Sequence, residues 1–407
     1  MARMEALTRA HTALERGHHA AALSLLTPLA EQGLADAQSA LAGLYDRGLG
    51  VPQNYAAAAA WYRKAADQGD AAAQNGLARL LAGGFGVPQD QVAALAYFRK
   101  AAEQGAAEHQ FDLATAYDNG IGVDKDPREA AKWYERAASQ GLAEAQASLG
   151  VLYYTGAGVP RDLGKALELY RAAAQQGSAR AQNNLGRMYT KGEGVAQDYA
   201  SAVDWFRKAA EQGLPQAIRN LGVMYDNGFG IRQDDAAAIE LYRLAGRKVT
   251  VQLDDVLAEI GLVYDHRLAP PLSTGDPAAE LAATRAAASH GDPVSQFMLA
   301  HVLAQGLTGA PDLRQAGDWY RKSAESGLVS AMTNLGLLYL TGRGVPQDFV
   351  LGYMWINVAA ASGQQDAVRV RDAIGPRMTS QQINEAQKLA SARWRSARES
   401  GVLNQEQ

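Results

Sequence analysis

The sequence predicts an all-α fold, a right-handed superhelical solenoid of stacked antiparallel helix pairs with a 36-residue period. A turn motif recurs at a constant interval, and apolar positions on both sides of it keep helical spacing in the same phase. The motif is Gly-x-Gly-Val/Ile, with its first glycine at Gly48, Gly84, Gly120, Gly156, Gly192 and Gly228. After one irregular unit the interval resumes at Gly306 and Gly342, again 36 residues apart.

The first helix of each unit is expected before the turn. A leucine is followed by glycine or alanine and, four residues after the leucine, usually by tyrosine, as in Leu185, Gly186 and Tyr189. Residues at i and i+4 share one stripe of a helix, and the small residue leaves room for a neighbouring helix. This leucine column comprises Leu41, Leu77, Leu113, Leu149, Leu185, Leu221, Leu299 and Leu335.

The second helix is expected after the turn. It carries an apolar pair such as Trp205-Phe206, followed by two alanines, and glycines such as Gly177 follow its end. Its start is marked by a side chain that can accept a hydrogen bond from a free backbone N–H. These predicted N-caps are Asn54, Asp90, Asp126, Asp162, Asp198, Asp234, Asp312 and Asp348.

The stretch "NNLGRMYTKGEGVAQD", Asn183 to Asp198, admits another interpretation, because a glycine loop beside basic side chains can hold a phosphate. A dinucleotide-binding loop needs a preceding strand and a third glycine, and a P-loop needs Gly-Lys-Ser/Thr. Neither is present, and the motif recurs in nearly every unit. We therefore expect the glycines to end the first helix, the valine to fill the core and Asp198 to begin the second helix.

The repeat phase divides the chain into three parts. Residues 1–33 are expected to form an N-terminal capping helix pair, and residues 34–363 nine repeats. The unit at about 248–291 departs from the pattern and contains a loop at 266–276. Residues 364–407 are expected to form C-terminal capping helices and a tail. Thr379 and Gln382 predict a capping box there, and Arg393, Arg395 and Arg398 a polar face turned to solvent.

The unit A-x-x-x-L-G-x-x-Y-x-x-G-x-G-V-x-x-D-x-x-x-A-x-x-W-Y-x-x-A-A-x-x-G resembles the Sel-1-like repeat, a relative of the tetratricopeptide repeat. The ending "YMWINVAAASGQ" and onward is similar to the terminal segment common in bacterial members. The resemblance implies an adaptor that holds protein partners, and no shared reaction. Some cysteine-rich members are linked to penicillin binding, which does not carry over because this chain has no cysteine and no Ser-x-x-Lys.

The composition excludes several other classes of function and site. A formal net charge of −4 without a run of Lys or Arg gives no footprint for nucleic acid. The absence of cysteine excludes disulfides and thiolate metal sites. The apolar run "AAALSLLTPLA" is too short to span a bilayer, so no transmembrane segment is expected. We expect no cofactor, and either a cytoplasmic protein or a periplasmic one whose export signal has been removed.

A partner site is expected on the inner wall of the solenoid, where first-helix side chains are not used in packing. Amides there can hydrogen-bond a peptide backbone, and Arg and Lys can bind a carboxylate. An acidic or C-terminal peptide segment is the expected ligand; solvated residues with local ion pairs are the alternative. The candidate residues are Tyr154, Arg180, Asn183, Asn184, Arg187, Lys191, Arg219 and Asn220.

Other functions are also open to the sequence. An envelope or exopolysaccharide-assembly module would bind carbohydrate, with Phe111, Tyr154 and Phe297 as stacking platforms, or a secretion-machinery partner. The connection from Leu268 to Asp276 is either a docking loop or a tolerated linker. Scattered histidines and the lack of a catalytic motif indicate that the protein is not an enzyme.

Overall fold

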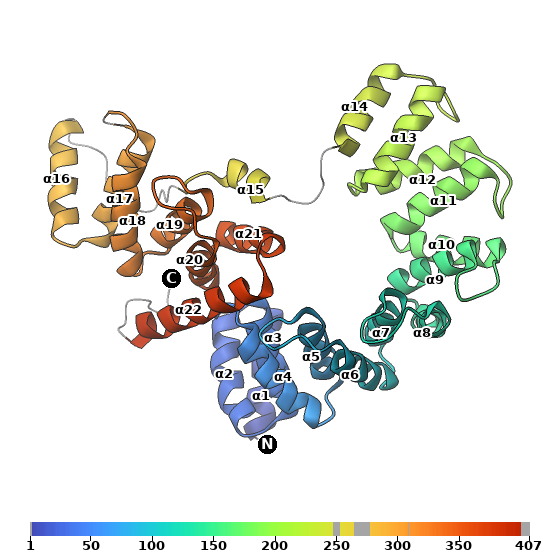
Figure 1. Cartoon of the computed structure of the whole chain (residues 1–407), viewed down its shortest axis with the longest axis horizontal. Coiled ribbons are helices and arrows are strands. Elements are labelled where there is room, and N and C mark those ends of the chain that lie inside the picture. The colour runs from blue at the N-terminus through green and yellow to red at the C-terminus, as the bar shows by residue number, and fades with distance from the viewer. Residues whose placement is uncertain (1, 247–252, 264–276, 308, 400–407) are drawn as a thin grey trace. The chain divides into compact units, whose positions relative to one another are not determined.

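The computed structural model describes residues 2–246, 253–263, 277–307 and 309–399, and within these ranges the regular structure is helical (Figure 1). It comprises 22 α-helices and one short 3-10 helix in the described residues, with consecutive helices packed in pairs. The predicted all-α solenoid of stacked helix pairs is confirmed. The chain forms two compact units: unit 1 contains Met1–Gln68, Gly83–Pro88 and Leu253–Gln407, and unit 2 contains Gly69–Ala82 and Gln89–Gln252.

Unit 2 consists of successive helix pairs (Figure 1). We call the first helix of a pair its A helix and the second its B helix. The A helices are α5 (Ala71–Gly83, all but its last residue), α7 (Ala107–Asn119), α9 (Ala143–Thr155), α11 (Ala179–Lys191) and α13 (Pro215–Asn227). The B helices are α6 (Gln91–Glu103), α8 (Pro127–Ser139), α10 (Leu163–Gln175), α12 (Tyr199–Glu211) and α14 (Asp235–Gly246).

Unit 1 combines the start and the end of the chain. The start contributes α1 (Ala2–Glu15), α2 (His19–Glu31), α3 (Ala35–Arg47) and α4 (Tyr55–Asp67). The end contributes α15 (Leu253–Ile260), α16 (Pro277–Ser289), α17 (Pro293–Gln305), α18 (Leu313–Glu325), α19 (Val329–Thr341), α20 (Phe349–Ala361), α21 (Gln365–Ile374), a 3-10 turn (Gly375–Arg377) and α22 (Ser380–Glu399). The loop predicted from Leu268 to Asp276 lies outside the described residues.

The start of each B helix follows from its cap. All eight predicted N-cap side chains accept a backbone N–H from the first turn of their helix, as Asp162 does from Lys165 at 3.0 Å. The predicted capping box of α22 is confirmed as well. Thr379 N donates to Gln382 Oε1 at 3.0 Å, and Gln382 N donates to Thr379 Oγ1 at 3.2 Å. Local side-chain chemistry therefore sets where these helices begin.

The turn glycines have a conformational role, as predicted. In the turn after α9, Gly156 and Gly158 have φ angles of 77° and 71°, in the left-handed region that favours glycine. A Cβ atom on Gly158 would also lie 2.3 Å from the carbonyl oxygen of Pro127, the first residue of α8. The turn thus closes its own A helix and approaches the B helix of the preceding pair too closely for any side chain.

Two features join neighbouring helices inside unit 2. The ring of Tyr170 lies over Gly150, where a Cβ would be 2.7 Å from a ring carbon, which explains the small residue after the column leucine. Buried glutamines also join the two helices of one pair: the amide of Gln212, at the end of α12, donates to Gln182 Oε1 of α11 at 2.8 Å. The same bond joins Gln104 to Gln74, Gln140 to Gln110 and Gln176 to Gln146, and in unit 1 it joins Gln68 to Gln38. We call this row of bonds the glutamine ladder.

A buried polar cluster connects the two ends of the chain within unit 1. Asn357 of α20 accepts a hydrogen bond from Gln53 N at 2.9 Å and donates one to Gln53 O at 3.0 Å. The Tyr353 hydroxyl bonds to Gln53 Oε1, and Gln387 of α22 accepts from Tyr55 N at 2.9 Å. We call Gln53, Tyr353, Asn357 and Gln387 the polar clasp. The bonds from Gln53 to α20 join residues 300 or more positions apart in the sequence.

Helix α22 has two faces with different environments. Ile383, Ala386 and Ala390 are buried, and the helix packs on α20 and contacts α4 (Figure 1). On the side predicted to face solvent, Arg395 and Arg398 are not buried, whereas the Arg393 guanidinium lies 4.1 Å from the ring centroid of Trp355. Burial lowers the pKa of Arg393. The helix therefore covers the last repeat and also joins it to the first.

Candidate functional site

The predicted site residues come from three consecutive A helices of unit 2. Tyr154 lies on α9, Arg219 and Asn220 lie on α13, and α11 carries the others, namely Arg180, Asn183, Asn184, Arg187 and Lys191. The A-helix side chains that do not pack against the B helices form one side of the unit, which we call the A-helix face. The helical phase of the repeat places all these candidates on or at the edge of this face.

Several candidates influence the pKa of one buried tyrosine. Tyr170 of α10 is 2% exposed, and burial raises the pKa of its hydroxyl. The positive charges of Arg187 and Arg180 and the nearby Asn184 side chain act on that pKa in the opposite direction. Arg180, Asn184 and Arg187 therefore all favour ionisation of Tyr170, against the effect of burial. The sequence pattern marks Tyr170 only as one of a helix-core pair.

Tyr154 connects α9 to the turn that follows α11. Its hydroxyl donates to Glu193 Oε2 at 2.5 Å, and the Arg187 guanidinium lies 6.0 Å from its ring centroid. Arg161 donates from Nε to the Tyr154 carbonyl at 3.0 Å. Glu193 and Arg161 were not among the predicted residues. The signal for Glu193 was its place between the two turn glycines, where most other units carry an apolar residue.

Asn183 is corrected from a partner-binding residue to a structural one. It is 7% exposed, and its Oδ1 accepts a hydrogen bond from Asn220 Nδ2 at 2.9 Å. The position two before the column leucine points toward the next A helix rather than to solvent. Asn75 and Asp112 make the equivalent contact at 2.7 Å. The Asn183–Asn220 bond therefore holds α11 against α13, and it occupies one donor of Asn220.

The cations of the site are largely unpaired. Arg180, Arg187 and Arg219 are exposed, and within the described part of the chain no carboxylate forms an ion pair with any of them. Lys191 is the exception, with Nζ 3.9 Å from Glu193 Oε2. Local ion pairs, the alternative interpretation, thus account for Lys191 and not for the arginines. The result is a concentration of positive charge on α11 and α13.

The aromatic side chains predicted to stack on carbohydrate are not all exposed. Phe297 is completely buried and packs against Tyr320 with ring centroids 5.8 Å apart, so its prediction as an exposed platform is wrong. Phe111 is half-buried and tilted against Tyr134 at 5.6 Å. Tyr154 is also half-buried, and its hydroxyl donates a hydrogen bond to Glu193. Phe297 fails as a platform because its helix position faces the adjacent B helix.

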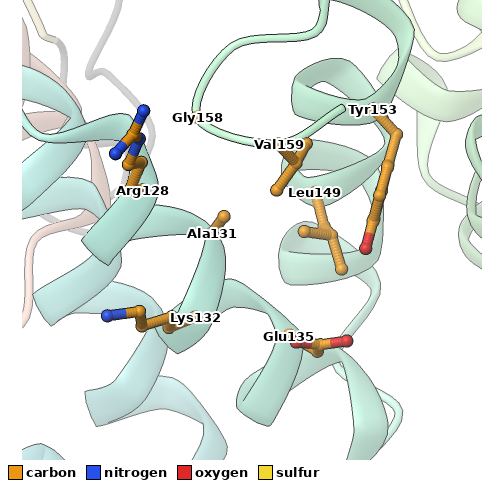
Figure 2. Close-up of a pocket in the computed structure, with 8 residues that line it drawn as sticks. All are labelled: Arg128, Ala131, Lys132, Glu135, Leu149, Tyr153, Gly158 and Val159. Atoms are coloured by element: carbon orange, nitrogen blue, oxygen red, sulfur yellow. The ribbon is translucent and has the colours of Figure 1, made fainter. Parts of the chain in front are cut away.

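A small hollow of about 280 Å³ lies between α8 and the hairpin of α9 and α10 (Figure 2). Arg128, Lys132 and Glu135 of α8 line one side, and Leu149, Tyr153 and Val159 line the other. Small-molecule sites usually measure about 300–1,000 Å³. Lys132 is also paired with Glu129 on its own helix. The hollow is therefore slightly smaller than such sites, and one of its two cations already has a partner.

Comparison with known proteins identifies the repeat. The model of the Sel1 repeat matches eight segments, at residues 35–70, 71–105, 107–142, 143–178, 179–214, 215–248, 293–328 and 329–364. The chain belongs to the Sel1 repeat family. The predicted resemblance is confirmed, and the irregular stretch between residues 248 and 293 is left unmatched.

Solved Sel1 repeat structures resemble the chain. A protective antigen of uropathogenic Escherichia coli with an SLR fold is 29% identical, with a TM-score of 0.54, and the match covers 98% of this chain and 97% of that one. A Sel1 repeat protein of Oxalobacter formigenes is 33% identical, with a TM-score of 0.56, over 60% of this chain and 97% of that one.

A curated relative shares a shorter stretch. Chitin synthase regulatory factor 3 of Schizosaccharomyces pombe is 34% identical over 84 residues, and this match spans only 9% of that protein's length. Sel1 repeat proteins, like their tetratricopeptide relatives, typically act as protein-interaction scaffolds and are generally not catalytic. Among the residues that the structure describes, no helix is both long and apolar enough to cross a bilayer.

Proposed function

We propose that this Sel1 repeat protein is a non-enzymatic adaptor that binds a protein partner on the A-helix face of α9, α11 and α13. The bound segment is acidic or ends in a free carboxylate. The observation that carries the proposal is the group of exposed arginines, Arg180, Arg187 and Arg219, which have no carboxylate partner in the described residues. Arg187 also lies 6.0 Å from the ring centroid of Tyr154, another of the predicted residues.

The chemistry of these groups suits a peptide carboxylate. A guanidinium can donate two parallel hydrogen bonds to a carboxylate, which adds direction as well as attraction. An asparagine amide both donates and accepts, so it can pair with the N–H and C=O of one extended residue. Asn357 binds the backbone of Gln53 in this way inside unit 1. Asn184 offers the same amide on α11.

Packing keeps the site ready for a ligand. Leu185, Gly186 and Met188 of α11 are buried, so the helix that carries the arginines is fixed by its apolar side. The Asn183–Asn220 bond ties it to α13. A rigid scaffold loses less conformational entropy on binding than a mobile one, which favours affinity. The architecture thus supplies position, and the exposed side chains supply recognition.

Charge reversal on the A-helix face tests the proposal. The Arg180→Glu/Arg187→Glu chain is compared with wild type in affinity capture of native proteins, followed by titration of the recovered partner. We expect affinity to fall at least about tenfold, or about 1.4 kcal/mol, because attraction to an acidic segment becomes repulsion. Wild-type affinity should also fall as salt rises, since exposed charges are screened over about 8 Å at 0.15 M ionic strength.

A control with the same change in net charge is available on α12. Arg207→Glu/Lys208→Glu removes a surface pair between Arg207 and Asp204 at 3.0 Å and the contact of Lys208 with Trp205 at 4.3 Å. Such surface contacts contribute little to stability. The control chain should recover the partner as wild type does. Equal recovery by the α11 variant and wild type, or equal losses in both variants, would refute the site.

A further inference from the structure

Residues 253–263 belong to unit 1 and pack on the rest of it in a way that resembles a bound peptide. Helix α15 contacts α21 (Figure 1), more than a hundred residues further along the chain. Val256 is 1% exposed and belongs to the same core cluster as Phe297, Leu335 and Leu337 of the A helices α17 and α19. Leu257, Ile260 and Leu262 are half-buried against this cluster. One side of the short segment is thus buried in the core of unit 1, and its helix contacts the A helix α21.

Polar contacts fix the end of this segment. The side chain of Asn334 on α19 accepts a hydrogen bond from Val263 N at 2.7 Å and donates one to Val263 O at 2.9 Å. Asn334 is completely buried. It directly precedes the column leucine Leu335, so it occupies the same repeat position as Asn184 and Asn220 of unit 2. An amide at this position can therefore hold both polar groups of one residue's backbone.

One charged contact adds direction to the segment. Glu259 of α15 accepts from Arg369 of α21 at 2.6 Å, and both side chains are about half exposed or more. The contact is accessible to solvent, so its charges can be exchanged without burying an unpaired group. It distinguishes the observed direction of the segment from the reverse one.

Comparison with unit 2 shows what the segment does to the A-helix face. Two residues after the column leucine, Leu337 of α19 is 3% exposed. The equivalent Val223 of α13 is 40% exposed, and Arg187 of α11 is also exposed. The face that is open on α11 and α13 is therefore covered in unit 1, where residues 253–263 join the same apolar cluster as Leu337.

We propose that the A-helix face of α19 and α21 is a second peptide-binding site, and that residues 253–263 are its built-in occupant. The site would take an acidic, amphipathic helical segment of a partner protein. Such a segment presents apolar residues in the pattern of Val256, Leu257 and Ile260, an acid toward Arg369, and an extended residue to Asn334. This site is separate from the arginine site of unit 2 and does not depend on it.

The occupant is suited to displacement. A helix of eight residues has little stability of its own, so α15 depends on its contacts with the A-helix face of unit 1. A partner segment that makes the same contacts competes with it directly. The partner binds only chains in which residues 253–263 have left this site, so its apparent affinity is lower than its intrinsic affinity. Any change that releases the segment raises the apparent affinity.

A synthetic peptide tests the site in the full-length chain. The probe is a fluorescent peptide of residues 253–263, LDDVLAEIGLV. Binding is measured by fluorescence anisotropy to wild type and to two chains with a weakened occupant, Val256→Asp and Glu259→Arg. We expect at least about tenfold tighter binding to these two chains than to wild type. Circular dichroism checks that both keep their helical content.

A charge swap tests whether the probe binds at the same site as residues 253–263, beside Arg369. Adding Arg369→Glu to the Val256→Asp chain should weaken binding of the probe, and a peptide carrying Glu259→Arg should restore it. The control variant Arg207→Glu/Lys208→Glu on α12, outside both sites, should leave probe binding unchanged, which excludes a general effect of surface charge. No binding to either folded weakened chain would overturn the proposal, because α15 would then be a fixed part of the core. Binding that ignores the charge swap, or that is equal for all chains, would overturn it too.

Discussion

At the scale of single residues, the second glycine of each turn decides how closely consecutive pairs approach. Gly158 has a φ of 71° and leaves no room for a Cβ beside Pro127. Gly177, after α10, has a φ of 94°, and a Cβ on it would have no neighbouring atom within 4 Å. Both need glycine for conformation, but only Gly158 needs it also for space.

Replacing these two glycines separates the two requirements. Gly177→Ala should cost about 1–2 kcal/mol, the usual penalty for alanine in the left-handed region. Gly158→Ala should cost at least about 1 kcal/mol more, because the turn must move away from α8 as well. Urea unfolding followed by circular dichroism measures both. Equal losses of stability would show that the close approach to Pro127 is not required.

A half-buried histidine, His301, gives unit 1 a dependence on pH. Burial lowers the pKa of His301 on α17 from its ordinary value of 6.5. The unfolded chain therefore binds a proton at His301 before the folded chain does, and stability falls as pH drops below about 6.5. The thermal midpoint of wild type should drop more between pH 7.5 and 5.5 than that of His301→Gln. An identical drop in both would mean that His301 titrates alike in the folded and unfolded states.

At the scale of helices, the glutamine ladder adds direction to the apolar packing within each pair. Gln182 is 5% exposed, and its amide donates to the Ala174 carbonyl at 3.2 Å while its oxygen accepts from Gln212. Buried polar groups are costly without partners, so each rung favours one register of an A helix against its own B helix. The bond from Gln182 to Ala174 of α10 does the same against the preceding pair. Apolar side chains alone would tolerate small slips along the helix axis.

A double-mutant cycle on one rung measures this contribution. Gln182→Leu should cost about 1–3 kcal/mol, because the Ala174 carbonyl and the Gln212 amide lose a partner. Gln212→Leu should cost less, since Gln212 is exposed. The two losses should fall short of additivity by about 1 kcal/mol in the double variant. Strict additivity of the urea-unfolding free energies would contradict a direct role for the rung.

The helices themselves were predictable because their signals are local. Asp162 caps the helix that it immediately precedes, and Gly158 forms the turn in which it stands, so neither depends on distant residues. Asn183 was predicted in the groove and is buried, because its orientation depends on Asn220 in the next repeat. The contact of residues 253–263 with the A-helix face of α19 was not predicted, because it depends on Val263, which is 71 residues from its partner Asn334.

At the scale of the whole molecule, the chain's two ends belong to one unit. The polar clasp joins Gln53 to Asn357 and Gln387, and Gly48 passes so close to Arg371 that a Cβ would lie 2.5 Å from its Nη1. Repeat periodicity could not reveal these contacts, because it reports only on neighbours along the solenoid. Unit 2 in turn carries the exposed arginines on two consecutive A helices, α11 and α13.

The central claim is that packing uses the buried columns of the repeats and leaves the A-helix face of unit 2 for a protein partner. Amide hydrogen exchange of the full-length chain, with and without the partner recovered by affinity capture, tests it most directly. We expect slower exchange in α9, α11 and α13 when the partner is bound, and no such change in the Arg180→Glu/Arg187→Glu chain. Slower exchange confined to the B helices α8, α10 and α12 would contradict the claim.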